Sequence, residues 1–149
     1  MRFVIFTLLL AYLNTGATST SPKRQLTNIL CRISGYKHGN KHIIEDGIKY
    51  LRAHDPQQAS ICHQPGGGCC ARVSCDQSAA IYVCNDNTDR DVLVSLSDVA
   101  DHAQAIVDTE ECVWVPSSGH VVQGQAFDDG GWNVIVGIRD GDSCSCCNS

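Results

Sequence analysis

Residues 95–109, SLSDVADHAQAIVDT, carry the clearest helical pattern of the chain and decide its fold class. Apolar side chains recur there at three- and four-residue spacing, which places them on one face of a helix. They are Leu96, Val99, Ala100, Ala103, Ile106 and Val107. Ser95, followed three residues later by Asp98, resembles a capping box. The pattern predicts a helix over residues 96–109.

A β-hairpin is predicted on each side of this helix. Before it, the runs 70–75 and 79–84 are rich in β-forming residues and are separated by three polar residues. After it, the runs 121–127 and 132–138 are separated by the turn sequence DDGG. Side chains alternate between the two faces of a strand. In the run 132–138, one face therefore carries Trp132, Val134 and Val136, and the other face carries Asn133 and Ile135.

Further from the centre, a first helix is predicted over residues 43–54. Ile44, Ile48 and Leu51 recur at helical spacing, and Asp55-Pro56 ends the pattern because proline cannot continue a helix. A short strand is predicted within residues 25–33. Polar or glycine-containing loops are predicted over 35–42, 56–69 and 85–91, and a connection over 113–119. The resulting order, β-α-β-β-α-β-β, predicts an α+β fold in which two helices pack on one face of an antiparallel sheet.

The first residues indicate export. Arg2 precedes an apolar run over residues 3–13, which is shorter than the roughly 20 residues that span a bilayer, and small residues follow it. We therefore expect a signal peptide over residues 1–19, with a buried N-terminal helix as the alternative. No later apolar run approaches spanning length, so we expect an extracellular protein without stable membrane insertion.

Lys23-Arg24 resembles the sites cut by the subtilisin-like processing protease of the fungal late secretory pathway. Cleavage there would make residues 20–24 a pro-segment and residues 25–149 a single disulfide-rich domain. The alternative is an exposed basic pair. The chain has a formal charge of −5, and the part from Gln25 onward has 8 Lys+Arg against 16 Asp+Glu, or −8. This charge argues against nucleic acid as the main partner, because phosphate binding needs a basic face.

Ten cysteines set the redox class, and all lie in the expected mature part: Cys31, Cys62, Cys69, Cys70, Cys75, Cys84, Cys112, Cys144, Cys146 and Cys147. In an exported chain an even number indicates a disulfide framework whose connectivity spacing alone does not give. We expect each member of the adjacent pairs 69–70 and 146–147 to bond to a different partner. The rival interpretation, a zinc site at residues 144–147, lacks the second cysteine pair or histidines that zinc sites have.

The sequence predicts no catalytic site, no metal and no cofactor. Asp108, Glu110 and Glu111 are close together at a helix end, where a solvated surface cluster is favoured over a hydrolytic pair. The glycines at 66–68 lack the ending of a phosphate loop and instead predict a tight turn beside the cysteines. The 85–91 loop is rich in oxygen side chains but lacks the turn glycine and closing glutamate of a calcium loop.

Contact residues for a partner are harder to assign. A small basic loop extends from Lys37 to Lys41 and contains His38, and His42 follows it. Trp114, Trp132 and Tyr82 are candidates if exposed, since aromatic residues are enriched at binding hot spots. We expect Trp132 and Tyr82 to be buried.

Four segments carry a resemblance to a known group of proteins: CARVSC at 70–75, AIYVCND at 80–86, GQAF at 124–127 and GWNVIV at 131–136. They resemble small cysteine-rich secreted proteins of plant-associated ascomycete fungi, many of which are regarded as candidate effectors. The element order also resembles the killer-toxin-like fold, a disulfide-held α/β sandwich. Effectors of the canola blackleg fungus, which form a sheet with helical cover, are a second resemblance that the sequence leaves open.

The resemblance implies two disulfides and a mode of action. The killer-toxin-like fold implies the pairs Cys31–Cys112 and Cys75–Cys144. The resemblance to secreted fungal proteins implies a non-enzymatic effector of the virulence or avirulence type that binds a host protein or a co-secreted protein, outside host cells or after uptake. The alternative is a killer-toxin-like antimicrobial protein that acts on membranes or channels of competing microbes.

Overall fold

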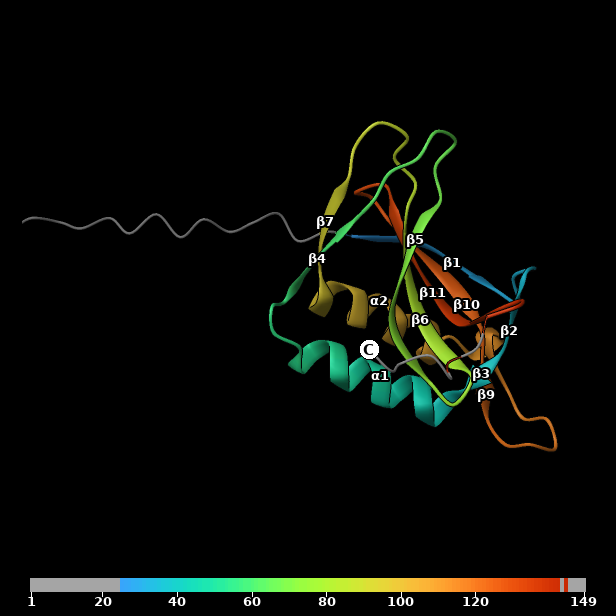
Figure 1. Cartoon of the computed structure of the whole chain (residues 1–149). Helices are drawn as coiled ribbons and strands as arrows, with labels where there is room; N and C mark the ends of the chain where they lie inside the picture. The colour runs from blue at the N-terminus through green and yellow to red at the C-terminus, as the bar shows by residue number, and fades with distance from the viewer. Residues whose placement is uncertain (1–24, 143, 145–149) are drawn as a thin grey trace, which may run out of the picture.

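The computed structural model describes residues 25–142 and 144. The predicted signal peptide, the pro-segment with Lys23 and Arg24, and the cysteines Cys146 and Cys147 lie outside the described residues. The described part has the predicted α+β fold, in which every strand pairing is antiparallel and two helices cover one side of the main sheet (Figure 1).

The main sheet has six strands, and its order across the sheet is β1-β10-β11-β6-β5, with β2 paired to the end of β11. Two small sheets lie beside it, one of order β3-β9-β8 and the other made by β4 and β7. The strands are β1 (Leu26–Cys31), β2 (Tyr36–Lys37), β3 (Gly39–Asn40), β4 (Gln58–Ile61), β5 (Cys69–Asp76), β6 (Ala79–Asn85), β7 (Val92–Ser95), β8 (Val113–Trp114), β9 (Val121–Val122), β10 (Gly124–Asp128) and β11 (Trp132–Arg139).

Both helices pack on the same face of the main sheet. Helix α1 (Lys41–Ala53) lies against β5 and β6, helix α2 (Leu96–Asp108) lies against β10 and β11, and the helices also contact each other. A short 3-10 helix, η1 (Glu110–Cys112), follows α2. The side chains between the layers form one core, and burying each large aliphatic group there contributes about 1.5–3 kcal/mol.

Side-chain caps fix where the two helices begin. The Ser95 hydroxyl accepts a hydrogen bond from the backbone N–H of Asp98 at 3.3 Å, as the capping pattern predicts. The Asn40 side chain accepts from the N–H of His42 at 2.9 Å. The first helix therefore starts at Lys41, two residues before the predicted start at residue 43, because an N-cap and not a hydrophobic residue sets its boundary.

Gly47 lies inside α1, where glycine costs about 1 kcal/mol relative to alanine. The residue is buried against β5, and a Cβ atom built on it would lie 2.6 Å from Ser74 Oγ. The glycine thus lets helix and strand approach closely, and this contact explains its presence in a helix.

The last strand separates the two faces of the sheet as predicted. Trp132, Val134 and Val136 belong to the core beneath the helices, whereas Ile135 belongs to a second, smaller cluster on the opposite face. Tyr82 is part of this second cluster, and the disulfide-bonded Cys144 packs against it.

The predicted loop over 56–69 was wrong in part, because it contains β4. This strand pairs with β7, a second strand that the sequence does not predict. Each run is only four residues long, and the partners lie more than thirty residues apart. Such strands exist because of a distant partner and carry little local pattern. The same reason applies to the two-residue strands β2 and β3 inside the predicted 35–42 loop, and to β8 inside the 113–119 connection.

Four disulfides join the described cysteines. Cys31–Cys112 ties β1 to η1 and Cys75–Cys144 holds the chain after β11, and both are pairs that the resemblance implies. Cys62–Cys69 closes a short loop, and Cys70–Cys84 links facing residues of β5 and β6. As predicted, the adjacent Cys69 and Cys70 therefore bond to different partners.

Candidate functional site

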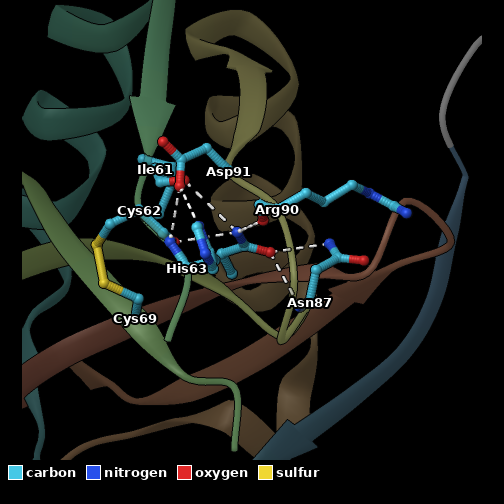
Figure 2. A network of polar contacts seen from close by, with 8 residues as sticks. Ile61, Cys62, His63, Cys69, Asn87, Arg90 and Asp91 are labelled. Carbon is cyan, nitrogen blue, oxygen red and sulfur yellow. Dashed lines mark hydrogen bonds and ion pairs between the residues drawn. A yellow bond between two sulfur atoms is a disulfide. The ribbon is translucent and has the colours of Figure 1, made fainter. Parts of the chain in front are cut away.

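Three connections meet at the end of the sheet where β6 and β10 finish and β11 starts: the loops 62–68 and 85–91 and the turn 128–131. The strand pairing shows that they meet, because Trp132 at the start of β11 pairs with Asn85 at the end of β6 and with Asp128 at the end of β10. Figure 2 shows the first two loops side by side, with Cys62–Cys69 at their base. We call this the loop end.

The Asn85 side chain makes the hydrogen bonds that connect the segments of the loop end. Its side chain is fully buried, and Nδ2 donates to the carbonyl oxygens of Cys62 at 3.0 Å and of Arg90 at 2.8 Å. Its Oδ1 accepts from the backbone N–H of Asn87 at 3.0 Å and from the Asn87 side chain at 2.8 Å. The Asn85 amide therefore forms hydrogen bonds with backbone and side-chain groups of both the 62–68 and the 85–91 loop. These bonds hold the two loops together.

Replacing this amide should loosen the loop end. We expect Asn85→Ala to lower the free energy of unfolding by about 3 kcal/mol, because several buried carbonyl and N–H groups lose their partner. Urea unfolding followed by tryptophan fluorescence measures this loss. Thr88→Ala, an exposed position on the same loop, is the matched control and should change stability little. Equal losses in the two variants would contradict the assigned role of Asn85.

His63 and Asp91 make a second link between the same loops (Figure 2). The Asp91 carboxylate accepts from the backbone N–H of His63 at 3.0 Å and lies 2.6 Å from its Nδ1. The hydrogen bond from the His63 side chain lowers the pKa of Asp91 below its ordinary value of 3.8. This carboxylate of the 85–91 loop therefore binds N–H groups of the protein.

The lowered pKa of Asp91 predicts a pH-dependent stability. Because the folded state favours the carboxylate, its stabilising contribution is complete above pH 3.8 and disappears as the pH falls through the lowered pKa. We expect Asp91→Asn to flatten the decline of the urea midpoint on acidification. Asp89→Asn, on the same exposed loop, is the control. A decline that stays as steep in Asp91→Asn as in the control would contradict this link.

A histidine and an aspartate are also buried together beneath the loop end. His102 Nε2 lies 3.1 Å from Asp128 Oδ2, and both side chains are almost completely buried. His102 Nδ1 lies 2.9 Å from the carbonyl oxygen of Asp98, and its ring stands 4.8 Å from that of Trp132. Because the pair is enclosed in the core, its role is to hold α2 against the β10–β11 turn.

At the opposite end of the sheet, an exposed arginine and an exposed histidine lie against a half-buried tryptophan. The indole of Trp114 is half-buried, Arg32 lies over it with its guanidinium carbon 5.0 Å from the ring centre, and the ring of His38 meets it edge-on at 5.4 Å. Val115, the next residue, is 64% exposed. Arg32 and His38 are exposed, so a cation, an imidazole and an aromatic ring share one surface.

A hollow of about 420 Å³ adjoins this cluster at the start of α1. Its lining residues are Asn40, Lys41, His42, Glu45 and His120. Strand pairing brings them together, since β3 pairs with β9 and the N–H of Lys41 donates to the carbonyl oxygen of His120 at 3.0 Å. We call the Trp114 cluster and this hollow the Trp114 surface.

The structure thus places the three aromatic contact candidates differently. Trp132 and Tyr82 are buried, as expected, and Trp114 is partly accessible. The predicted basic loop lies beside Trp114, a neighbourhood that the sequence analysis did not find. Local pattern could not reveal it, because more than seventy residues separate His38 from Trp114.

The acidic cluster and the glycine run that the sequence analysis considered lie where structural roles explain them. Asp108, Glu110 and Glu111 are exposed at the end of α2 and in η1, as expected for a solvated cluster. The glycines at 66–68 all have positive φ, and a Cβ on Gly67 would lie 2.9 Å from the Asp86 carbonyl oxygen. They form the tight turn that the sequence predicts.

Within residues 25–142 and 144, no group of three or more His, Cys, Asp or Glu side chains is arranged to hold a metal ion. None of the helices in the same part of the chain combines the length and apolarity needed to cross a membrane.

Fold and surface together define a disulfide-stabilised α+β protein. Comparison with protein-family models, with curated proteins and with solved structures gave no match for the chain.

Proposed function

We propose that this chain is a secreted, cysteine-rich effector of a plant-associated fungus that acts by binding a host protein or a co-secreted protein, not by catalysis. The observation that carries the proposal is the set of four disulfides, with Cys31–Cys112 and Cys75–Cys144 among them. Disulfides form and persist in oxidising compartments, which agrees with export. The two pairs are those that the resemblance to the killer-toxin-like fold implies.

Cross-links at these positions suit a protein that recognises others outside the cell. They tie both ends of the described chain to the sandwich, through β1 and through Cys144. A surface held in one conformation loses little conformational entropy when it binds, so more of the contact energy appears as affinity. The Trp114 surface supplies an accessible tryptophan and an arginine, residue types that dominate binding hot spots.

The test is recovery of a partner from the tissue in which an effector would act. The full chain, with a C-terminal tag, is expressed in leaf tissue, and the proteins bound to the secreted material are identified. Each is then purified and titrated against the oxidised protein alone. We expect a stoichiometric complex that is lost when the disulfides are reduced. Absence of both a partner and a leaf response would contradict the proposal.

The alternative, a killer-toxin-like antimicrobial protein, is supported by the same two disulfide pairs. A growth-inhibition assay distinguishes it from an effector. Purified oxidised protein is applied to growing fungi and yeasts without any added partner. The effector proposal predicts no growth inhibition. Inhibition that disappears on reduction of the disulfides would favour an antimicrobial protein.

A further inference from the structure

We propose that the Trp114 surface is the docking site for an acidic segment of another protein. This inference rests on the proposed function and specifies which surface carries it and which chemistry it recognises. Four observations support it: the distribution of charge, the Arg32–Trp114 contact, the backbone of Arg32, and the exposed apolar residue beside them.

The distribution of charge is uneven along the chain and in space. Residues 25–44 and 113–127 contain no aspartate or glutamate, although the chain has 16 acids. The fold brings these two segments together, because β1 pairs with β10 and β3 pairs with β9. These two paired segments therefore carry Arg32, Lys37 and Lys41 but no carboxylate side chain. Acids lie around them: Glu45 bonds Lys41, Glu111 lies three residues before Trp114, and the backbone N–H of Asp140 donates to the Gly35 carbonyl oxygen at 3.0 Å.

Arg32 and Trp114 form the centre of the surface. A guanidinium at 5.0 Å from the indole centre is within the range of a cation–π interaction, which holds the side chain in place. Within the described residues, no carboxylate forms an ion pair with Arg32. Arg32 is exposed, so its guanidinium can donate to an incoming carboxylate in a bidentate geometry.

The backbone of Arg32 is strained. Its φ is +55°, in the left-handed region that non-glycine residues rarely adopt. The Cys31–Cys112 disulfide immediately before it, and the bond from its N–H to the Gln123 carbonyl oxygen at 3.5 Å, maintain this conformation. Strain that the surrounding structure maintains is characteristic of functional positions. Here it accompanies the placement of the guanidinium over the indole.

Apolar area completes the surface. Val115 is 64% exposed, and the chain that follows it, the orange loop between β8 and β9, projects from the body of the molecule (Figure 1). Accessible apolar area next to an arginine–tryptophan pair is the composition of a protein-binding hot spot.

A protein segment fits this surface better than an extended polyanion. Nucleic acid and anionic bilayers present many charges over a wide area, and a part carrying −8 from Gln25 onward repels them. A short acidic segment can instead contact only Arg32, Trp114 and their immediate neighbours. At physiological salt, charges beyond about 8 Å are screened, so repulsion from the loop end is weak for such a segment.

The test uses a defined probe, a short fluorescent peptide of alternating glutamate and leucine, with the lysine–leucine peptide as its counterpart. Binding to the oxidised protein is measured by anisotropy at low and at high salt. We expect the acidic peptide alone to bind, more weakly at high salt. Arg32→Glu and Trp114→Ala should each weaken binding about tenfold or more.

Two matched variants separate the surface from folding and from net charge. Arg32→Gly removes the cation while suiting the positive φ, so it should fold normally and still lose binding. Arg90→Glu makes the same change in charge at the loop end and should bind like the wild type.

Three results would overturn the inference: a wild type that does not bind the acidic peptide, equal weakening by Arg32→Glu and Arg90→Glu, or preferred binding to phosphatidylserine vesicles. The proposed function fails separately. A leaf partner recovered equally well by Arg32→Glu rejects this surface and keeps the effector proposal. Absence of any leaf partner, with the peptide results as expected, rejects the effector proposal alone.

Discussion

Removing the Cys31–Cys112 disulfide by replacing both cysteines with alanine is expected to lower the free energy of unfolding by about 4 kcal/mol. The bridge closes a loop with a sequence separation of 81, and a longer loop loses more entropy when it is closed in the unfolded chain. Cys112 is also fully buried against the core, so the lost sulfur contacts add to this cost. Because a domain has a stability of about 5–15 kcal/mol, the variant should be close to unfolding.

The measurement is urea unfolding of the oxidised wild type and of the double variant. The matched control removes Cys62–Cys69, which has a sequence separation of only 7 and is expected to cost about 2 kcal/mol. The long-range bridge should therefore cost clearly more than the short one. Equal losses, or a larger loss in the control, would show that the Cys31–Cys112 bridge does not constrain the unfolded chain as argued.

Replacing His102 with alanine is the second change with a large expected effect. The variant removes a buried imidazole whose Nε2 lies 3.1 Å from Asp128 Oδ2, so a buried carboxyl group loses this neighbour and a cavity forms, at a cost of about 3 kcal/mol. It also removes the ring that packs on Trp132. Thermal and urea unfolding should both show the loss, whereas His120→Ala, at an exposed position, should change little.

A double variant tests whether the loss arises from the pair. Adding Asp128→Asn to His102→Ala replaces the carboxyl group that faces His102, so the two changes together should cost less than the sum of the single changes. The coupling between them measures the interaction. Losses that simply add would place the cost of His102→Ala in packing against Trp132 and not in the contact with Asp128.

Much of the fold could be predicted from the sequence because its main elements carry local patterns. The helix after Ser95 has an apolar stripe and a cap, and the two hairpins have alternating strands around polar or glycine-rich turns. These patterns are enough to predict two helices on one face of an antiparallel sheet. The ribbon of β4 and β7 could not be predicted, because each strand forms only through pairing with a distant partner.

The candidate surface was predictable only in pieces. The basic loop and Trp114 can each be recognised in the sequence, but their contact depends on the pairing of β3, β8 and β9, which the chain sets over long distances. Two buried polar groups did leave a signal. Asn85 ends a strand that is otherwise apolar, and His102 falls between Val99 and Ile106 on the apolar stripe of α2. A polar residue at a core position predicts a specific buried hydrogen-bond partner.

Mass spectrometry of the native protein, before and after reduction, tests directly whether disulfides in this pairing lock the chain. The account predicts a mass gain of at least about 8 Da on reduction, roughly two per bridge. It also predicts cross-linked peptides that join Cys31 to Cys112, Cys62 to Cys69, Cys70 to Cys84 and Cys75 to Cys144. Free thiols at these positions, or peptides joined in another pairing, would contradict it.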